Sequence, residues 1–148
     1  MNRLFLTALA AIAFAALPAR THASDLDDVT VPLQAYLDGH ATGQARHFQR
    51  AFAPDAMLVG LKDGRYGQRS AADYIAQAAS GRAPADEHLR RRWIRSVNIT
   101  GNVATAVIEL DYPSMRALDH MSLLKFDDGW RIVVKSYEAV TPAAAAKD

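Results

Sequence analysis

The residues with the clearest capacity for chemistry lie in the stretch 119–137, which reads DHMSLLKFDDGWRIVVKSY. A histidine changes its charge near neutral pH, so His120 is a candidate general base or a hydrogen-bond partner for a ligand. Asp119 precedes it, but neighbouring side chains on a strand point to opposite faces, so we do not expect a dyad. His120 is the candidate catalytic residue, and a histidine that only lines a pocket wall is the alternative.

The same stretch predicts a long β-hairpin. Asp127, Asp128 and Gly129 separate two apolar runs, which indicates a three-residue loop with glycine in the left-handed conformation. This register places four pairs on one face: Phe126 with Trp130, Leu124 with Ile132, Ser122 with Val134, and His120 with Ser136. That face is apolar near the turn and polar at its far end. We therefore expect a pocket whose mouth lies near His120 and Ser122.

Further side chains can line this pocket and orient a flat ligand by stacking and by their polar ends. The predicted ligand-binding set contains Tyr36, His40, Tyr74, Trp93, Tyr112 and Ser122. Tyr36, on the first predicted helix, is the strongest of these candidates. Aromatic residues at such spacings are also typical of a plain packed core, and that interpretation stays open.

No metal site or cofactor is expected. His40 and His47 could face His120 across a cavity, but the sequence has no HExxH or comparable ligand spacing. The chain also has no cysteine, which excludes thiol chemistry and thiolate ligands.

Charged residues crowd two of the predicted strands. The arginines beside Trp93 are Arg90, Arg91, Arg92 and Arg95. Strand alternation divides them between two faces, which favours a charged edge strand over a phosphate-binding stripe. An anionic ligand held by Arg91 or Arg95 is the alternative. Glu109 and Asp111 share a face, where we expect them to pair with arginines of a neighbouring strand rather than form an acid and base pair.

The N-terminal residues 1–23 have the pattern of a secretory signal peptide: Arg3, an apolar run from Leu4 to Leu17, and a small-residue end at Ala23. The apolar run is too short to span a membrane comfortably. Loss of Arg3 and Arg20 from the 17 basic residues leaves 15 against 16 acidic ones. We therefore expect an exported, periplasmic or secreted protein with no nucleic-acid partner and no stable membrane insertion.

The remaining chain has the size of one domain, residues 24–140, followed by a flexible tail at 141–148. Helical spacing predicts helices at 25–40, 42–52 and 70–80. Alternation predicts strands at 56–62, 89–99 and 103–112, besides the two strands of the hairpin. Helices followed by antiparallel strands indicate an α+β fold, with the helices lying on one face of a strongly curved sheet to make a cone.

Four segments resemble the nuclear transport factor 2-like superfamily, and most closely its putative lumazine-binding group: YLDGHATGQARHFQRAF, AFAPDAMLVGLKDG, VNITGNVATAVIEL and DHMSLLKFDDGWRIVVKSY. The most telling pieces are Gly101 to Ala104, Leu123 to Lys125 and Asp128 to Trp130. The likeness covers about residues 29–138. It implies a cone with a cavity between helices and sheet, and a homodimer formed through the sheet. The superfamily hosts binding modules, isomerases, dehydratases and scaffolds, so the resemblance does not fix a chemistry.

The sequence as a whole favours an exported domain that binds a small, partly apolar ligand in its cone cavity. A cofactor-independent lyase or isomerase with His120 as general base is the enzymatic alternative. A dimeric interaction module without a ligand is the third.

Overall fold

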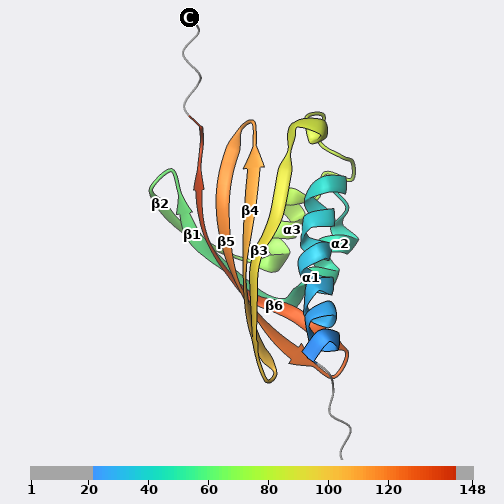
Figure 1. Ribbon diagram of the computed structural model, residues 1–148. Coiled ribbons are helices and arrows are strands. Elements are labelled where there is room, and N and C mark those ends of the chain that lie inside the picture. The colour runs from blue at the N-terminus through green and yellow to red at the C-terminus, as the bar shows by residue number, and fades with distance from the viewer. Residues whose placement is uncertain (1–21, 143–148) are drawn as a thin grey trace, which may run out of the picture.

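The computed structural model describes residues 22–142, with side chains from Asp25. In this part of the chain the helices lie beside one curved sheet (Figure 1). The helices are α1 (His22–Thr42), α2 (Ala45–Ala51) and α3 (Ala71–Ala78), with a short 3-10 turn at Glu87–Leu89. The strands are β1 (Phe52–Lys62), β2 (Arg65–Ser70), β3 (Arg91–Thr100), β4 (Val103–Tyr112), β5 (Met115–Phe126) and β6 (Gly129–Val140).

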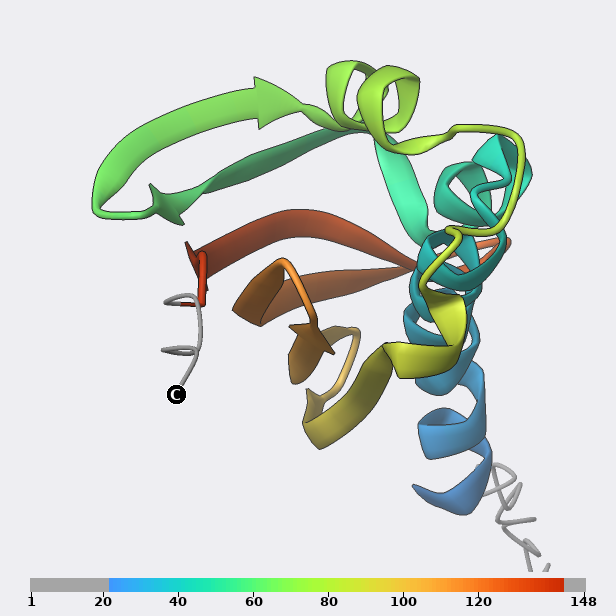
Figure 2. The same ribbon diagram turned by 90° about the horizontal axis from the view of Figure 1, so that it is seen from above.

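The strands form a single sheet in the order β2-β1-β6-β5-β4-β3. Only the β1 and β6 neighbours are parallel, and the other pairs are antiparallel. The sheet curls without closing, and α1 lies across its concave face (Figure 2). We call the end with the β3–β4 and β5–β6 turns the narrow end, and the opposite end, where α1 finishes, the wide end. The predicted α+β cone is confirmed. Strand β2 was not predicted, because its sequence RYGQRS has no apolar alternation.

Local sequence signals explain where the helices begin and how they meet. The Ser70 side chain accepts a hydrogen bond from the Asp73 backbone N–H at 3.1 Å, which caps α3 as its sequence predicts. Gly39 lets α1 approach α2, since a Cβ at this position would lie 2.6 Å from the Phe48 ring. Gly43 has φ +67° and ends the turn after α1. These contacts fix the angle between α1 and α2.

The β5–β6 hairpin differs from its predicted register near the turn. Phe126 pairs with Gly129 and Lys125 with Trp130, so Asp127 and Asp128 alone form the loop. A bulge between Ser122 and Leu123 then shifts the register. Beyond it, the predicted pairs of Ser122 with Val134 and His120 with Ser136 are confirmed. The predicted pairs Phe126 with Trp130 and Leu124 with Ile132 are wrong, because the loop has two residues rather than three and shifts the register near the turn by one residue.

The core fills the concave side of the sheet. The most deeply buried side chains include Trp130, Ile132, Leu123 and Ile108, all within 1% of full burial, so the hairpin tryptophan is packed in the core. On β5, the buried residues are Ala117, Asp119, Met121 and Leu123. The odd-numbered positions of β5 therefore face the helices, and the even-numbered ones face away.

The predicted signal peptide at 1–23 and the tail at 141–148 fall largely outside the described residues. Between residues 22 and 142, none of the helices is long and apolar enough to cross a membrane.

Candidate functional site

A buried ionic cluster lies inside the cone, between α1 and strands β5 and β6. The Lys135 ammonium donates to Asp119 Oδ1 at 2.9 Å and to the Tyr36 hydroxyl at 3.0 Å. The Tyr36 hydroxyl in turn donates to Asp119 Oδ2 at 2.6 Å. Asp119 has no exposed surface and Lys135 is 5% exposed. Together, the three side chains form a closed triangle in which both oxygens of Asp119 accept a hydrogen bond.

A second polar pair lies against this triangle. The Tyr74 hydroxyl and His40 Nε2 are 2.8 Å apart. The His40 ring packs edge-on against Tyr36, with 4.7 Å between ring centroids, and against Phe48 at 5.4 Å. The Lys135 ammonium also lies 5.3 Å from the ring centroids of both Tyr36 and Tyr74. Aromatic faces thus surround the cation and add to its stabilisation.

Burial changes the protonation of these groups. Burial, followed by the nearby Lys135 and Arg92 cations, holds the pKa of His40 well below its ordinary value. The imidazole is therefore neutral at physiological pH, and Nε2 can accept the Tyr74 proton. Burial, followed by the Asp119 charge, raises the pKa of Tyr36 well above its ordinary value, and burial also raises the pKa of Tyr74. Both tyrosines remain protonated donors.

Tyr112 extends the cluster toward the wide end of the cone. Its ring centroid is 6.0 Å from that of His40, and its hydroxyl accepts a hydrogen bond from Arg92 Nε at 3.0 Å. Arg92 is held by a two-bond ion pair with Glu87, at 2.7 and 2.5 Å. The segment that contains the 3-10 turn is thereby attached to the inner face of β3.

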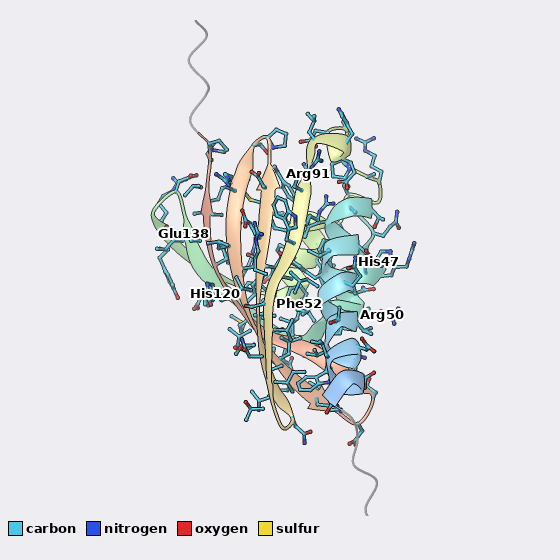
Figure 3. All side chains as sticks on the ribbon, in the orientation of Figure 1. His47, Arg50, Phe52, Arg91, His120 and Glu138 are labelled. Carbon is cyan, nitrogen blue, oxygen red and sulfur yellow. The ribbon has the colours of Figure 1, made fainter. Side chains whose placement is uncertain are left out.

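The structure brings together four of the predicted ligand-binding residues: Tyr36, His40, Tyr74 and Tyr112. The other predicted site residues, His120, Ser122 and Trp93, lie on the outer face of the sheet. Figure 3 shows His120 on the side away from the helices, whereas Phe52 lies between sheet and helices. The prediction that His120 and Ser122 share a cavity with Tyr36 is therefore wrong, because the odd positions of β5 face inward. A lyase or isomerase with His120 as base inside the cone loses its geometric basis.

Asp119 and Lys135 are the site residues that sequence reasoning missed. Asp119 is a charged residue in a pattern of apolar residues at every second position, which contains Ala117, Met121 and Leu123. This break in the pattern was the sequence signal for Asp119. No sequence signal marked Lys135 as an inward residue, because the register shift opposite Ser122 and Leu123 changes which residues of β6 face inward. No group of three or more potential metal ligands occurs within residues 22–142.

The charged residues on the outer face form ion pairs as predicted. Glu109 pairs with Arg95 at 2.5 Å, and Asp111 pairs with Arg116 at 3.1 Å. Arg95 also lies over the Trp93 ring, 4.7 Å from its centroid. Glu109 and Asp111 therefore belong to surface ion pairs, and they do not form an acid and base pair inside the cone.

Comparison with solved structures places this fold in a known class. A nuclear transport factor 2-like protein of unknown function from Silicibacter pomeroyi DSS-3 is 27% identical, with 79% of this chain and 97% of that chain covered and a TM-score of 0.69. A similar protein from Shewanella baltica OS155 is 22% identical, with 83% and 98% covered and a TM-score of 0.72. One from Methylobacillus flagellatus KT is 24% identical, with 81% and 95% covered and a TM-score of 0.70.

The curved sheet, the three helices and these neighbours define a nuclear transport factor 2-like domain. Residues 24–138 match the family model described as putative lumazine-binding, and the chain belongs to that family. A search of curated proteins found no match.

Proposed function

We propose that this protein is exported and binds a small, partly apolar molecule inside its cone. The observation that carries the proposal is the buried triangle of Tyr36, Asp119 and Lys135, with His40 and Tyr74 packed against it. The family's name associates it with lumazine, a flat bicyclic heteroaromatic compound, and a ligand of that size and flatness suits the aromatic walls.

Stability alone is a poor reason to place an ion pair at this position. Removing two charges from water costs several kcal/mol per ion, and apolar residues of similar volume often give equal or greater stability. Asp119 and Lys135 nevertheless lie among apolar neighbours in the core. A role in ligand recognition accounts for that cost, because a buried charge recognises a polar group more strongly than an exposed one.

The cluster has donor capacity left for a ligand. An ammonium group carries three protons, and Asp119 and Tyr36 accept two of those of Lys135. The third is available for a carbonyl or ring nitrogen of a ligand. Tyr137 lies beside it, with its ring centroid 4.7 Å from the ammonium, and is only partly buried. A ligand that enters from the wide end and displaces Tyr137 reaches Lys135 directly and stacks on the tyrosine rings.

Native mass spectrometry of the protein purified from its own host tests this proposal. We expect a species heavier than the polypeptide by the mass of one small molecule, which organic solvent releases. A mass equal to that of the bare chain in every gentle preparation would contradict ligand binding. It would favour the interaction module instead.

We also propose that two copies pair through the outer face of the sheet. Large apolar residues are exposed along this face: Trp93 38%, Leu118 44%, Leu124 38%, Val134 39% and Val140 43%. Arg95, Glu109 and Arg116 lie on the same face, so a two-fold arrangement can oppose unlike charges. A second copy is therefore the partner that suits this surface.

Sedimentation velocity tests the pairing. We expect a dimer for the native chain and a monomer for Leu118→Glu, which places a charge among the apolar residues. Ala76→Glu, on the exposed side of α3, is the matched control and should remain dimeric. The dimer would be contradicted if the native chain still sediments as a monomer at about 100 times the protein concentration used in the native mass spectrometry.

A further inference from the structure

A half-buried arginine on the inner face of the sheet has no acidic partner. Arg69 of β2 pairs with Leu58 of β1, and Leu58 pairs with Lys135 of β6, so the three residues share this face. Lys135 is matched by Asp119, whereas Arg69 forms no ion pair with any carboxylate that the structure describes. Because His40 is neutral, the ionic cluster and Arg69 together carry one positive charge in excess.

Helix α3 holds the Arg69 guanidinium against the cluster. Its central carbon lies 4.9 Å from the Tyr74 ring centroid, and the Lys135 ammonium lies 5.3 Å from the same centroid. Arg69 Nη1 donates to the side-chain oxygen of Gln77. Tyr74 is itself fixed by its contact with His40. The guanidinium is therefore positioned in advance, which lowers the entropy cost of binding.

The guanidinium keeps donors for a ligand. It carries five N–H groups, and within the described residues it makes only the bond to Gln77. Nε is fully enclosed and has no acceptor, so a ligand does not reach this atom. Nη2 also makes no hydrogen bond, but it keeps accessible surface. A carboxylate at Nη2 would neutralise the arginine through a charge-assisted hydrogen bond.

Two glycines leave room beside the guanidinium. Gly60 and Gly67 pair across β1 and β2, on the same inner face as Arg69. A Cβ at Gly67 would meet no atom within 4 Å, so the surface next to Arg69 is open. A Cβ at Gly60 would lie 2.7 Å from the Tyr137 ring, which therefore needs a glycine there. A ligand that displaces Tyr137 to reach Lys135 can lie across this open surface.

We infer that the ligand inside the cone is a flat aromatic carboxylate whose acidic group binds Arg69. The inference rests on the proposed function and adds the chemical class of the ligand. The aromatic ring stacks on the tyrosine rings beside Lys135, and the carboxylate accepts a hydrogen bond from Arg69 Nη2. One unmatched guanidinium calls for a single negative charge on the ligand.

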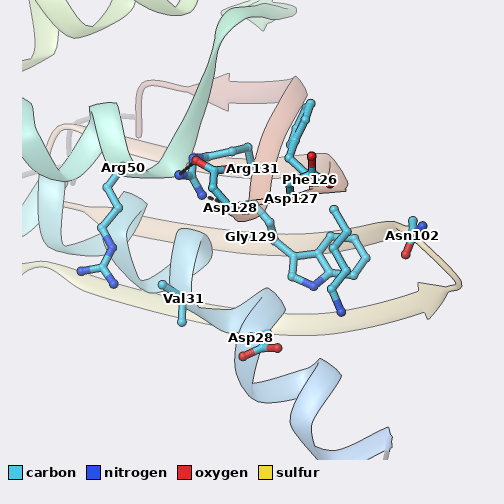
Figure 4. Close-up of a pocket in the computed structure, with 11 residues that line it drawn as sticks. Asp28, Val31, Arg50, Asn102, Phe126, Asp127, Asp128, Gly129 and Arg131 are labelled. Atoms are coloured by element: carbon cyan, nitrogen blue, oxygen red, sulfur yellow. Dashed lines mark hydrogen bonds and ion pairs between the residues drawn. The ribbon is translucent and has the colours of Figure 1, made fainter. Parts of the chain in front are cut away.

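The narrow end of the cone is a different environment for an acid. Figure 4 shows Arg131 paired with Asp128, at 3.0 Å, in a groove that Asp28 and Asp127 also line. Arg50, at one end of this groove, is exposed. A carboxylate there would meet the acidic side chains, and Arg50 therefore provides a control for Arg69.

Nuclear magnetic resonance titration with benzoate and benzamide tests the inference. The two probes have the same ring and nearly the same size, but only benzoate is charged at neutral pH. We expect benzoate to bind about tenfold or more tightly, the effect of a hydrogen bond between charged groups. It should move the Gly67 N–H resonance, assigned with Gly67→Ala, and leave that of Gly129 at the narrow end in place.

Arg69→Gln should weaken benzoate binding about tenfold and leave benzamide binding nearly unchanged. Arg65→Gln, at an exposed position on the same face of β2, and Arg50→Gln should each change benzoate binding about twofold or less. Equal affinity of the native chain for the two probes would overturn the carboxylate and leave ligand binding in the cone intact. Weakening by Arg50→Gln in place of Arg69→Gln would overturn it too, as would benzoate that moves no resonance at about 10 mM.

Discussion

The Lys135 ammonium lies 2.9 Å from Asp119 Oδ1, and both side chains are almost completely enclosed by the core of the cone. Strands β5 and β6 place them on the same inner face, where Tyr36 of α1 completes their hydrogen bonding. The pair is buried too deeply for solvent to compensate either charge alone. Each side chain therefore depends on the other.

This dependence predicts strong coupling between Asp119 and Lys135. Asp119→Leu or Lys135→Met alone leaves an uncompensated buried charge and should lower the free energy of unfolding by about 3 to 5 kcal/mol. The double variant should lose much less than the two single losses added together, because no charge is left buried. Urea unfolding of the four proteins measures this coupling. Additive losses would show that the two charges do not compensate each other in the folded chain.

The low pKa of His40 predicts a loss of stability in acid. The unfolded chain takes up a proton at this histidine near pH 6.5, while the folded chain keeps it neutral. Its contribution is therefore fully present above pH 6.5 and decreases as the pH falls below that value. Between pH 7.5 and 5.5, the free energy of unfolding should fall by about 1.4 kcal/mol more in the native chain than in His40→Asn.

His88→Asn is the control for this measurement, because His88 is exposed and its replacement should preserve the pH dependence. An identical pH dependence in the native chain and in His40→Asn would mean that the folded state accommodates a charged His40.

The two tryptophans should differ strongly in their contribution to stability. Trp130 is 1% exposed, whereas Trp93 is 38% exposed on the outer face. Trp130→Ala should cost about 3 to 5 kcal/mol by opening a cavity in the core. Trp93→Ala should cost about 1 kcal/mol or less in the monomer. Equal losses in urea unfolding of dilute protein would contradict this assignment of the two sheet faces.

The sequence also predicts removal of residues 1–23 on export. N-terminal sequencing of the protein recovered outside the cytoplasm should start at Ser24 or within a few residues of it. Recovery of the same protein with an intact Met1 would contradict export by signal cleavage.

The overall fold was predictable because it depends on long repeating patterns. The helical spacing around Tyr36, the cap at Ser70 and the turn glycines Gly101 and Gly129 each specify an element locally. The same patterns predicted that Tyr36, His40, Tyr74 and Tyr112 share the interior of the cone, since each lies on a clear helix or strand.

The face of the β5–β6 hairpin was not predictable in this way. A one-residue slip moves every side chain to the other face. The two-residue loop makes such a slip by placing Lys125, rather than Phe126, opposite Trp130, and the bulge beyond it has no sequence signal. The pattern around Leu124 and Ser122 is apolar enough on both faces to allow either orientation. His120 was therefore assigned to the interior, and Asp119 and Lys135 were overlooked.

The most direct test of ligand binding inside the cone compares two variants purified from the native host. Tyr36→Phe removes one hydroxyl from the ionic cluster, whereas His120→Ala alters the outer face. Native mass spectrometry should show that Tyr36→Phe loses bound ligand, with affinity reduced by about 1 to 3 kcal/mol, and that His120→Ala retains it at the native occupancy. Full occupancy in Tyr36→Phe together with an empty His120→Ala would contradict the account and place the site on the outer face of the sheet.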